Sequence, residues 1–150
     1  MLLYPENFDR DYQFLSAELA GLAHPWGTLV LSVPSLLRSF AIPDDGYHVG
    51  LHEFAHLLDK EGVYFDGIPP GLDSKRTDEW IAVQRKEMEL LRAGRSVLDS
   101  YGAESAVEFF AVSVEAFFER SADLERQHPE LYRMLSWYFA LDPASWTASS

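Results

Sequence analysis

The sequence contains no cysteine among its 150 residues. This absence excludes disulfide bonds, cysteine-ligated zinc sites and thiol nucleophiles. Basic residues are also scarce, since 12 lysines and arginines stand against 24 aspartates and glutamates, for a formal net charge of -12. Nucleic acids and anionic membrane surfaces are bound through clustered lysine and arginine, so we expect neither kind of partner.

Long hydrophobic runs are absent too, and no stretch reaches the roughly 18 apolar residues of a membrane span. The start of the chain, Met1 to Glu6, has no basic region followed by an apolar run, so we expect no signal peptide and a cytoplasmic location. The length suits a single domain covering residues 1–150, and a hydrophobic content of 47% is enough for a packed core.

The spacing of apolar residues predicts an α+β fold in which a small sheet packs on helices. We expect strands at residues 1–5 and 27–33. The expected helices cover residues 8–23, 35–40, 47–60, 77–93, 104–120 and 129–140, with Gly62 closing the third, a surface loop over 61–76 and a frayed tail from residue 142. In the helix of residues 77–93, Thr77 is the expected N-cap, and Glu79 or Glu87 is expected to face solvent.

The segment from Leu51 to Asp59 contains the pattern H-E-x-x-H. His52 and His56 are four residues apart and therefore lie one turn apart on the same helical face, where both imidazoles reach one metal ion. Glu53 follows the first histidine and lies beside the open coordination position, where it can take a proton from metal-bound water. Two imidazoles and a carboxylate suit zinc, so we predict Zn²⁺.

A chance match on a solvent-exposed helix is the alternative interpretation of this pattern. The flanking residues count against it, because they are apolar on almost every side of the helix: Val49, Leu51, Phe54, Ala55, Leu57 and Leu58. Such a helix is expected to be buried, and buried histidine and glutamate side chains need polar partners. The pattern therefore favours a metal site.

A catalytic zinc needs a third protein ligand as well as an open position. The metzincin pattern would place glycine at position 59 and histidine at position 62, but this chain has Asp59 and Gly62. His24, His48 and His128 remain, and none of them lies in an obvious helix that faces the site. The third ligand is therefore not expected to be a histidine.

Glu108 is the better candidate for the third ligand. The predicted helix of residues 104–120 is apolar at nearly every position, and Glu108 and Glu115, seven residues apart, lie on nearly the same face. Two buried carboxylates are costly unless a cation meets them, so we expect Glu108 to bind the metal and Glu115 to support a metal-binding histidine. The alternative is that both mark a solvated stripe. Asp59, three residues after His56, is the next candidate ligand, although a helix-positioning role suits it better.

Several short motifs along the chain form a more specific pattern than H-E-x-x-H alone. They are Tyr4-Pro5-x-x-Phe8, Gly27-x-Leu29-Val30-Leu31-Ser32, His52-Glu53-Phe54-Ala55-His56-x-Leu58-Asp59, Asp66-Gly67-x-Pro69, Tyr101, Glu108-Phe109-Phe110-Ala111-Val112-x-x-Glu115-x-Phe117-Phe118, and Pro129-x-Leu131-Tyr132 through Tyr138 to Asp142-Pro143. This ordered set, which covers almost the whole chain, resembles the Mlc titration factor A family of zinc peptidases.

The resemblance implies a gluzincin-type site with His52, His56 and Glu108 as metal ligands and Glu53 as the general base. It also implies a zincin-like metallopeptidase fold, distantly similar to the catalytic domain of anthrax lethal factor. In such enzymes a tyrosine seven residues before the ligand glutamate points into the site. Here that residue is Tyr101, which would donate a hydrogen bond to the oxyanion, or would simply pack before the helix. The family's name further implies a regulatory protein partner.

We therefore predict a zinc metallopeptidase that cleaves peptide or protein substrates with a zinc-bound water activated by Glu53. The strand of residues 27–33 would hold an extended substrate along its edge. A second hypothesis is a regulatory protein that sequesters a partner, such as a transcriptional repressor, but such a role does not require Glu53. A third is an inactive metal-stabilised domain in which Asp59 or Glu115 fills the fourth position. Aminopeptidase and endopeptidase activity are not distinguished by the sequence.

Overall fold

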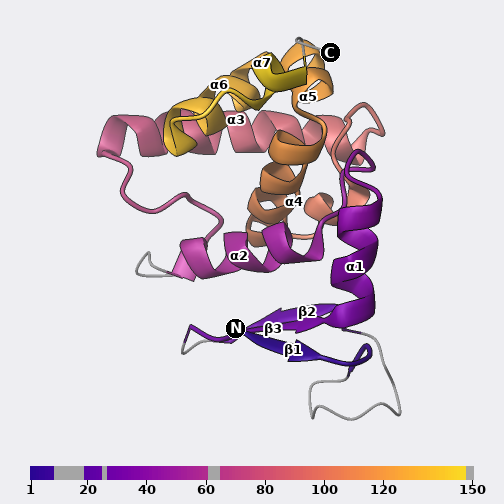
Figure 1. The fold of residues 1–150 in the computed structure, drawn as a ribbon. Helices are drawn as coiled ribbons and strands as arrows, with labels where there is room; N and C mark the ends of the chain where they lie inside the picture. Colours follow the sequence, from indigo (N-terminus) through magenta and orange to yellow (C-terminus); the bar gives the residue numbers. More distant parts are fainter. Residues whose placement is uncertain (9–18, 25–26, 61–64, 148–150) are drawn as a thin grey trace.

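The computed structural model describes residues 1–8, 19–24, 27–60 and 65–147, and it shows an α+β fold with a three-stranded sheet at one end (Figure 1). Strands β1 (Leu2–Tyr4), β2 (Gly21–Ala23) and β3 (Leu29–Ser32) lie in the order β1-β3-β2, with β1 parallel and β2 antiparallel to β3. Both edges of β3 are thus occupied. The prediction that residues 27–33 offer an edge to a substrate is wrong, because the outer edges of the sheet belong to β1 and β2.

The expected helix at residues 8–23 is also wrong over its last part. Residues 21–23 form β2, and Phe8 makes an isolated antiparallel bridge to Leu19. Residues 9–18 of that prediction lie outside the described residues, as does Gly62. Pairing with the apolar strand β3 decides the conformation here, which local spacing of hydrophobic residues does not reveal.

The helices follow the predicted pattern closely in the centre of the chain. They are α1 (Val33–Ala41), α2 (Val49–Lys60), α3 (Ser74–Arg92), the 3₁₀ helix η1 (Ser100–Ala103), α4 (Ala106–Glu119), α5 (Ser121–Gln127), α6 (Pro129–Phe139) and α7 (Pro143–Thr147). Asp73 rather than Thr77 caps α3, since its side chain accepts a hydrogen bond from the backbone N–H of Arg76. Helix α7 occupies part of the tail that was expected to be frayed.

Helix α4 is the centre of the hydrophobic core. Phe109, Phe110 and Phe117 have no exposed surface, and the helix lies between α2 on one side and α3 and α6 on the other, with further contacts to η1 and α5 (Figure 1). This position explains why α4 is apolar on every side. Among the described residues, no helix is long and apolar enough to cross a membrane.

Candidate metal centre

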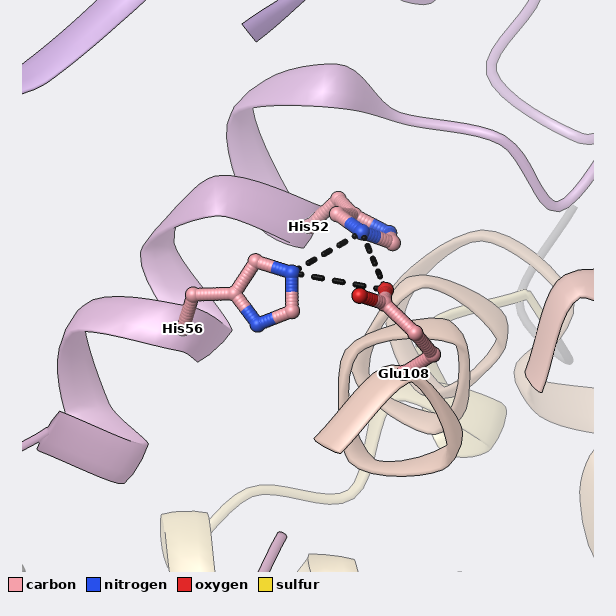
Figure 2. Close-up of side chains that lie close together, drawn as sticks. All are labelled: His52, His56 and Glu108. Atoms are coloured by element: carbon pink, nitrogen blue, oxygen red, sulfur yellow. Dashed lines mark hydrogen bonds and ion pairs between the residues drawn. The ribbon is translucent and has the colours of Figure 1, made fainter. Parts of the chain in front are cut away.

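Three side chains from α2 and α4 converge on one point (Figure 2). The Nε2 atoms of His52 and His56 are 3.2 Å apart, and the Oε2 atom of Glu108 lies 3.1 Å from the first and 3.4 Å from the second. The histidines are one turn apart on α2, as their spacing predicts, while Glu108 projects from the first turn of α4, which Ser105 caps. The packing of α2 against α4 therefore brings together the residues singled out in the sequence.

The three distances fit a single metal ion. Ligand atoms at about 2.0–2.2 Å from a tetrahedral ion are separated from one another by about 3.3 Å, the edge of the tetrahedron. The observed separations of 3.1–3.4 Å match that edge. Two imidazoles and one carboxylate, all partly buried, form a donor set suited to a divalent metal ion.

The electrostatics of the cluster favour a positive charge at the same point. Burial lowers the pKa of His52, but hydrogen bonds to Glu108 and Glu115 outweigh burial and raise that pKa to about 10. Burial likewise raises the pKa of Glu108, but hydrogen bonds from His52 and His56 lower it to about 2. Carboxylates on both sides of the imidazole thus stabilise a cation there, and a metal ion would compete with the proton for this position.

Glu115 fixes the orientation of His52 from the far side of the imidazole ring. Its Oε1 atom lies 2.7 Å from Nδ1 of His52, and its Oε2 atom accepts the backbone N–H of His48 at 2.5 Å. The side chain is 1% exposed. A carboxylate accepts but does not donate, so Nδ1 of His52 donates to Glu115, and Nε2 is the nitrogen that can hold either a second proton facing Glu108 or a metal ion. Glu115 lies in contact with a histidine of the cluster, as expected from the sequence.

Asp59 points away from the cluster and holds a loop instead. Its buried carboxylate accepts the backbone N–H groups of Asp66 at 3.3 Å and Gly67 at 3.0 Å. Gly67 has a φ of +73°, and a Cβ atom there would lie 2.1 Å from the carbonyl oxygen of Ala106 at the start of α4. Asp59 therefore ties the end of α2 to the beginning of the helix that carries Glu108. This contact fits the helix-positioning role and not the role of ligand.

Glu53 lies between α2 and strand β2 and is 8% exposed. The backbone N–H of Ala23 donates to its carboxylate, and burial raises the pKa of this group above its usual value. A Cβ atom at Gly21 would lie 2.6 Å from Cγ of Glu53, so the strand approaches the side chain closely only because residue 21 is glycine. The sheet thus fixes Glu53 beside the histidines. Nothing in the sequence around Gly21 and Ala23 signalled this contact.

Tyr101 belongs to η1 and lies beside the cluster. Its ring centroid is 5.9 Å from that of His52, and its side chain is about half exposed. Burial and the nearby carboxylates, Glu108 foremost, raise the pKa of its hydroxyl, so it stays protonated and able to donate at neutral pH. Tyr101, His52 and Glu53 all line one cavity of about 360 Å³.

Two residues outside the cluster lie differently from what the sequence suggested. Of Glu79 and Glu87, the two candidates for the solvent face of α3, Glu79 is exposed, but Glu87 is buried and lies 2.5 Å from Nδ1 of His128, which is itself buried. Nε2 of this histidine accepts the backbone N–H of Val97 at 3.3 Å. The pair is remote from α2, and its contacts are those of an internal brace. Phe54, expected to be buried, is about half exposed because it faces away from α4.

Comparison with known proteins agrees with this arrangement. The family described as glucose-regulated metallo-peptidase M90 matches residues 1–140. An uncharacterized protein of Synechocystis sp., slr2042, is 32% identical over 143 residues, covering 92% of this chain and 46% of that protein. Proteins named Mlc titration factor A are 29% identical in Edwardsiella ictaluri and 28% identical in Pectobacterium atrosepticum, each match covering 83% of this chain and 49% of the relative.

The chain spans about half the length of these curated relatives. The family match, however, covers nearly all of the chain, including α2 with both histidines and α4 with Glu108. The chain therefore belongs to the family of glucose-regulated metallo-peptidases M90.

Proposed function

We propose that this chain is a zinc-dependent peptidase, with His52, His56 and Glu108 as zinc ligands, Glu53 as general base and Tyr101 as oxyanion donor. The observation that carries the proposal is the set of donor separations, 3.1–3.4 Å, with a fourth functional side chain, Glu53, held next to them. Three protein ligands leave one position open, as in catalytic rather than structural zinc sites.

Zinc at such a site supplies Lewis acidity, which acidifies water and polarises a carbonyl oxygen. The chain's own residues then have separate tasks. Glu53 accepts a proton from the attacking water and later delivers it to the leaving amine. The hydroxyl of Tyr101 donates a hydrogen bond to the oxygen that becomes negative as the peptide carbonyl is attacked. Glu115 keeps His52 in the tautomer that leaves Nε2 available.

The environment of Glu53 supports its assignment as the base. A general base works best with a pKa near the operating pH, and burial moves the pKa of Glu53 upward in that direction. The Ala23 N–H and the absence of a side chain at Gly21 hold the carboxylate in one place. A residue that only completed the surface of α2 would not need such a close fit.

The test combines metal content with the variant Glu53→Gln. We expect about one zinc per chain in protein purified without added metal, and removal by a strong chelator. Glu53→Gln should keep zinc and fold but lose peptide hydrolysis, measured by mass spectrometry on a mixed pool of short peptides. Failure to take up zinc on titration would overturn the metal assignment. Equal inertness of the zinc-loaded wild type and variant would overturn the peptidase assignment.

A second candidate function is the sequestering of a regulatory protein. It is favoured by the name of two relatives, Mlc titration factor A, which describes a protein that titrates Mlc. Under this alternative the metal site is structural, and Glu53→Gln would bind the partner as well as wild type does. An inactive site closed by a fourth carboxylate is less well supported, because Asp59 binds a loop and Glu115 binds the far side of His52.

A further inference from the structure

The cavity of about 360 Å³ beside the metal centre is lined by His52, one of the proposed ligands, by the proposed base Glu53 and by the proposed oxyanion donor Tyr101. Its lining includes Tyr101 of η1, Asp99 just before that helix, and Gly21 of β2. His52 and Glu53 of α2 line it as well. A substrate side chain next to the scissile bond would therefore enter this cavity, and its lining would decide which side chain fits.

Apart from His52 of the metal cluster, the ionisable aspartate, glutamate, lysine and arginine side chains in the described lining of this cavity are all acidic. Glu53, Asp99 and Glu115 are among the lining residues, whereas no lysine or arginine is found in the described part of the lining. A bound zinc ion would not make the cavity positive. Its charge of +2, combined with the charge of -1 on Glu108, leaves +1 at the metal centre, whereas the lining has three carboxylates. Burial, followed by neighbouring carboxylates, raises the pKa of both tyrosines of the lining, Tyr47 and Tyr101, which agrees with a negative field inside the cavity.

Asp99 is the carboxylate in the best position to meet a ligand. Glu115 uses both oxygens within the protein, and Glu53 is held by Ala23. Asp99 is exposed and lines both this cavity and a neighbouring hollow that Arg120 also lines, and its Oδ1 atom accepts the backbone N–H of Tyr101 at 2.8 Å as the N-cap of η1. This bond fixes the direction of the side chain. Among the described residues its Oδ2 atom accepts no hydrogen bond.

The remaining lining completes a site for a long cationic side chain. Its apolar members offer contact to a methylene stem, and they are Leu19, Ala20, Val49 and Val112. Lysine and arginine combine such a stem with a charged head, and they place the stem on apolar surface while the head reaches polar groups. The net charge of -12 further raises the local concentration of cationic peptides.

We propose that this cavity selects peptides with a lysine or arginine at the residue it holds, and that Asp99 determines this specificity. The inference rests on the proposed peptidase function, and it adds the class of substrate. A merely apolar cavity would prefer an uncharged side chain of the same length, so lysine and norleucine, which share a four-carbon stem, separate the two possibilities.

The experiment measures binding of short peptides that carry lysine, norleucine or glutamate at one position at a time. The protein is the zinc-loaded Glu53→Gln chain, which should hold peptides without cutting them, studied by calorimetry. We expect lysine to bind about five- to tenfold more tightly than norleucine at one position, and glutamate to bind most weakly. Norleucine binding as tightly as lysine at every position, or no binding by any peptide, would overturn the inference.

Asp99→Asn in the same background removes the charge but keeps an acceptor for the N–H of Tyr101, since asparagine is an equally good N-cap. We expect it to abolish the preference for lysine. Asp73→Asn is the matched control, because Asp73 also caps a helix, is exposed and does not line the cavity. The same preference in Asp99→Asn as in the parent chain would contradict the role of Asp99.

Cleavage of the same peptides by the wild-type chain separates this inference from the proposed function. Faster cleavage of lysine peptides supports both. Preferential binding of lysine peptides with no cleavage supports the charge-selective cavity and contradicts the peptidase. Cleavage of norleucine and lysine peptides at equal rates supports the peptidase and contradicts the charge-selective cavity.

Discussion

Glu115 holds His52 through its Nδ1 atom, at 2.7 Å, on the side of the ring opposite to Glu108. The two carboxylates stand seven residues apart on α4, so a single helix contacts both nitrogens of the same imidazole. Glu108 lies next to Nε2, the nitrogen expected to bind metal, and Glu115 fixes the tautomer through Nδ1. The cluster is therefore preorganised by α4, which itself is anchored in the core.

Glu115→Gln should weaken zinc binding about 10- to 100-fold without removing any proposed ligand. Glutamine has only one acceptor oxygen, whereas Glu115 accepts from both His52 and the backbone of His48, so one of these bonds must be lost. Competition with a chromophoric chelator measures the affinity. Glu104→Gln, a change at an exposed residue between η1 and α4, is the control and should leave the affinity unchanged. An unaltered affinity in Glu115→Gln would show that Glu115 does not position His52.

Glu108→Ala should lose zinc affinity, whereas Asp59→Ala should mainly lose stability. Loss of Glu108 removes a proposed ligand, so zinc affinity should fall by orders of magnitude. Loss of Asp59 leaves the buried backbone N–H of Gly67 and the partly buried N–H of Asp66 without their acceptor, at a cost of about 1–3 kcal/mol in the free energy of unfolding, with at most a modest effect on zinc. Zinc titration and urea unfolding measure the two effects. If Asp59→Ala lost zinc binding and Glu108→Ala kept it, Asp59 would be the ligand and Glu108 would have the positioning role.

Tyr101→Phe should lower peptide turnover about 10²- to 10³-fold while zinc content stays the same, because one donor to the oxyanion is lost. The ring of Tyr101 would keep its place beside His52, so the fold should be unaffected. The variant Tyr47→Phe removes the other tyrosine hydroxyl of the same cavity and has no proposed contact with the oxyanion. An equal loss in both variants would contradict a specific role for Tyr101.

The proposed metal centre was predictable from the sequence to an unusual degree, for physical reasons. The spacing of His52 and His56 fixes their relation on one helix, and Glu108 and Glu115 stand out because they interrupt an otherwise apolar helix. Both signals are local in the sequence. The resemblance of the ordered motifs to a known family then joined them to one site, and the structure brings the three ligand candidates together.

The sequence-based predictions that failed concern residues whose structure depends on contacts with segments far away in the sequence. The identity of residues 21–23 as a strand is set by pairing with β3, and the approach of Gly21 to Glu53 is set by the packing of that strand on α2. Glu87 looked solvated because glutamate on an amphipathic helix usually is. Its burial depends on His128, 41 residues away, and local periodicity carries no information about such a partner.

Glu119 should make the stability of the fold depend on pH. Burial, with Asp45 and Glu115 nearby, raises its pKa to about 7, and its Oε2 atom is buried without a hydrogen-bond partner among the described residues. A carboxyl with a raised pKa in the folded state favours folding when protonated. Its contribution therefore declines as pH rises from about 4.5, the unfolded value, to about 7.

The variant Glu119→Gln cannot ionise and should lose this dependence. Relative to wild type, its free energy of unfolding should rise by about 1–3 kcal/mol between pH 4.5 and pH 8, as measured by urea unfolding across that range. The comparison between the two proteins cancels the titration of all other groups. A difference that stays constant with pH would show that Glu119 ionises normally.

The buried pair of Glu87 and His128 should contribute to stability and not to the metal centre. Each side chain is 2% exposed, and His128 also accepts the N–H of Val97, so it joins α3, the segment before η1 and the start of α6.

His128→Ala leaves a buried carboxylate without its partner and should cost about 3–5 kcal/mol in the free energy of unfolding. The double variant Glu87→Leu with His128→Leu removes both polar groups and should cost less than the sum of the single changes. Zinc affinity should remain that of wild type in every variant that folds. A single change that costs under about 1 kcal/mol, or a perfectly additive double variant, would show that the pair is not coupled.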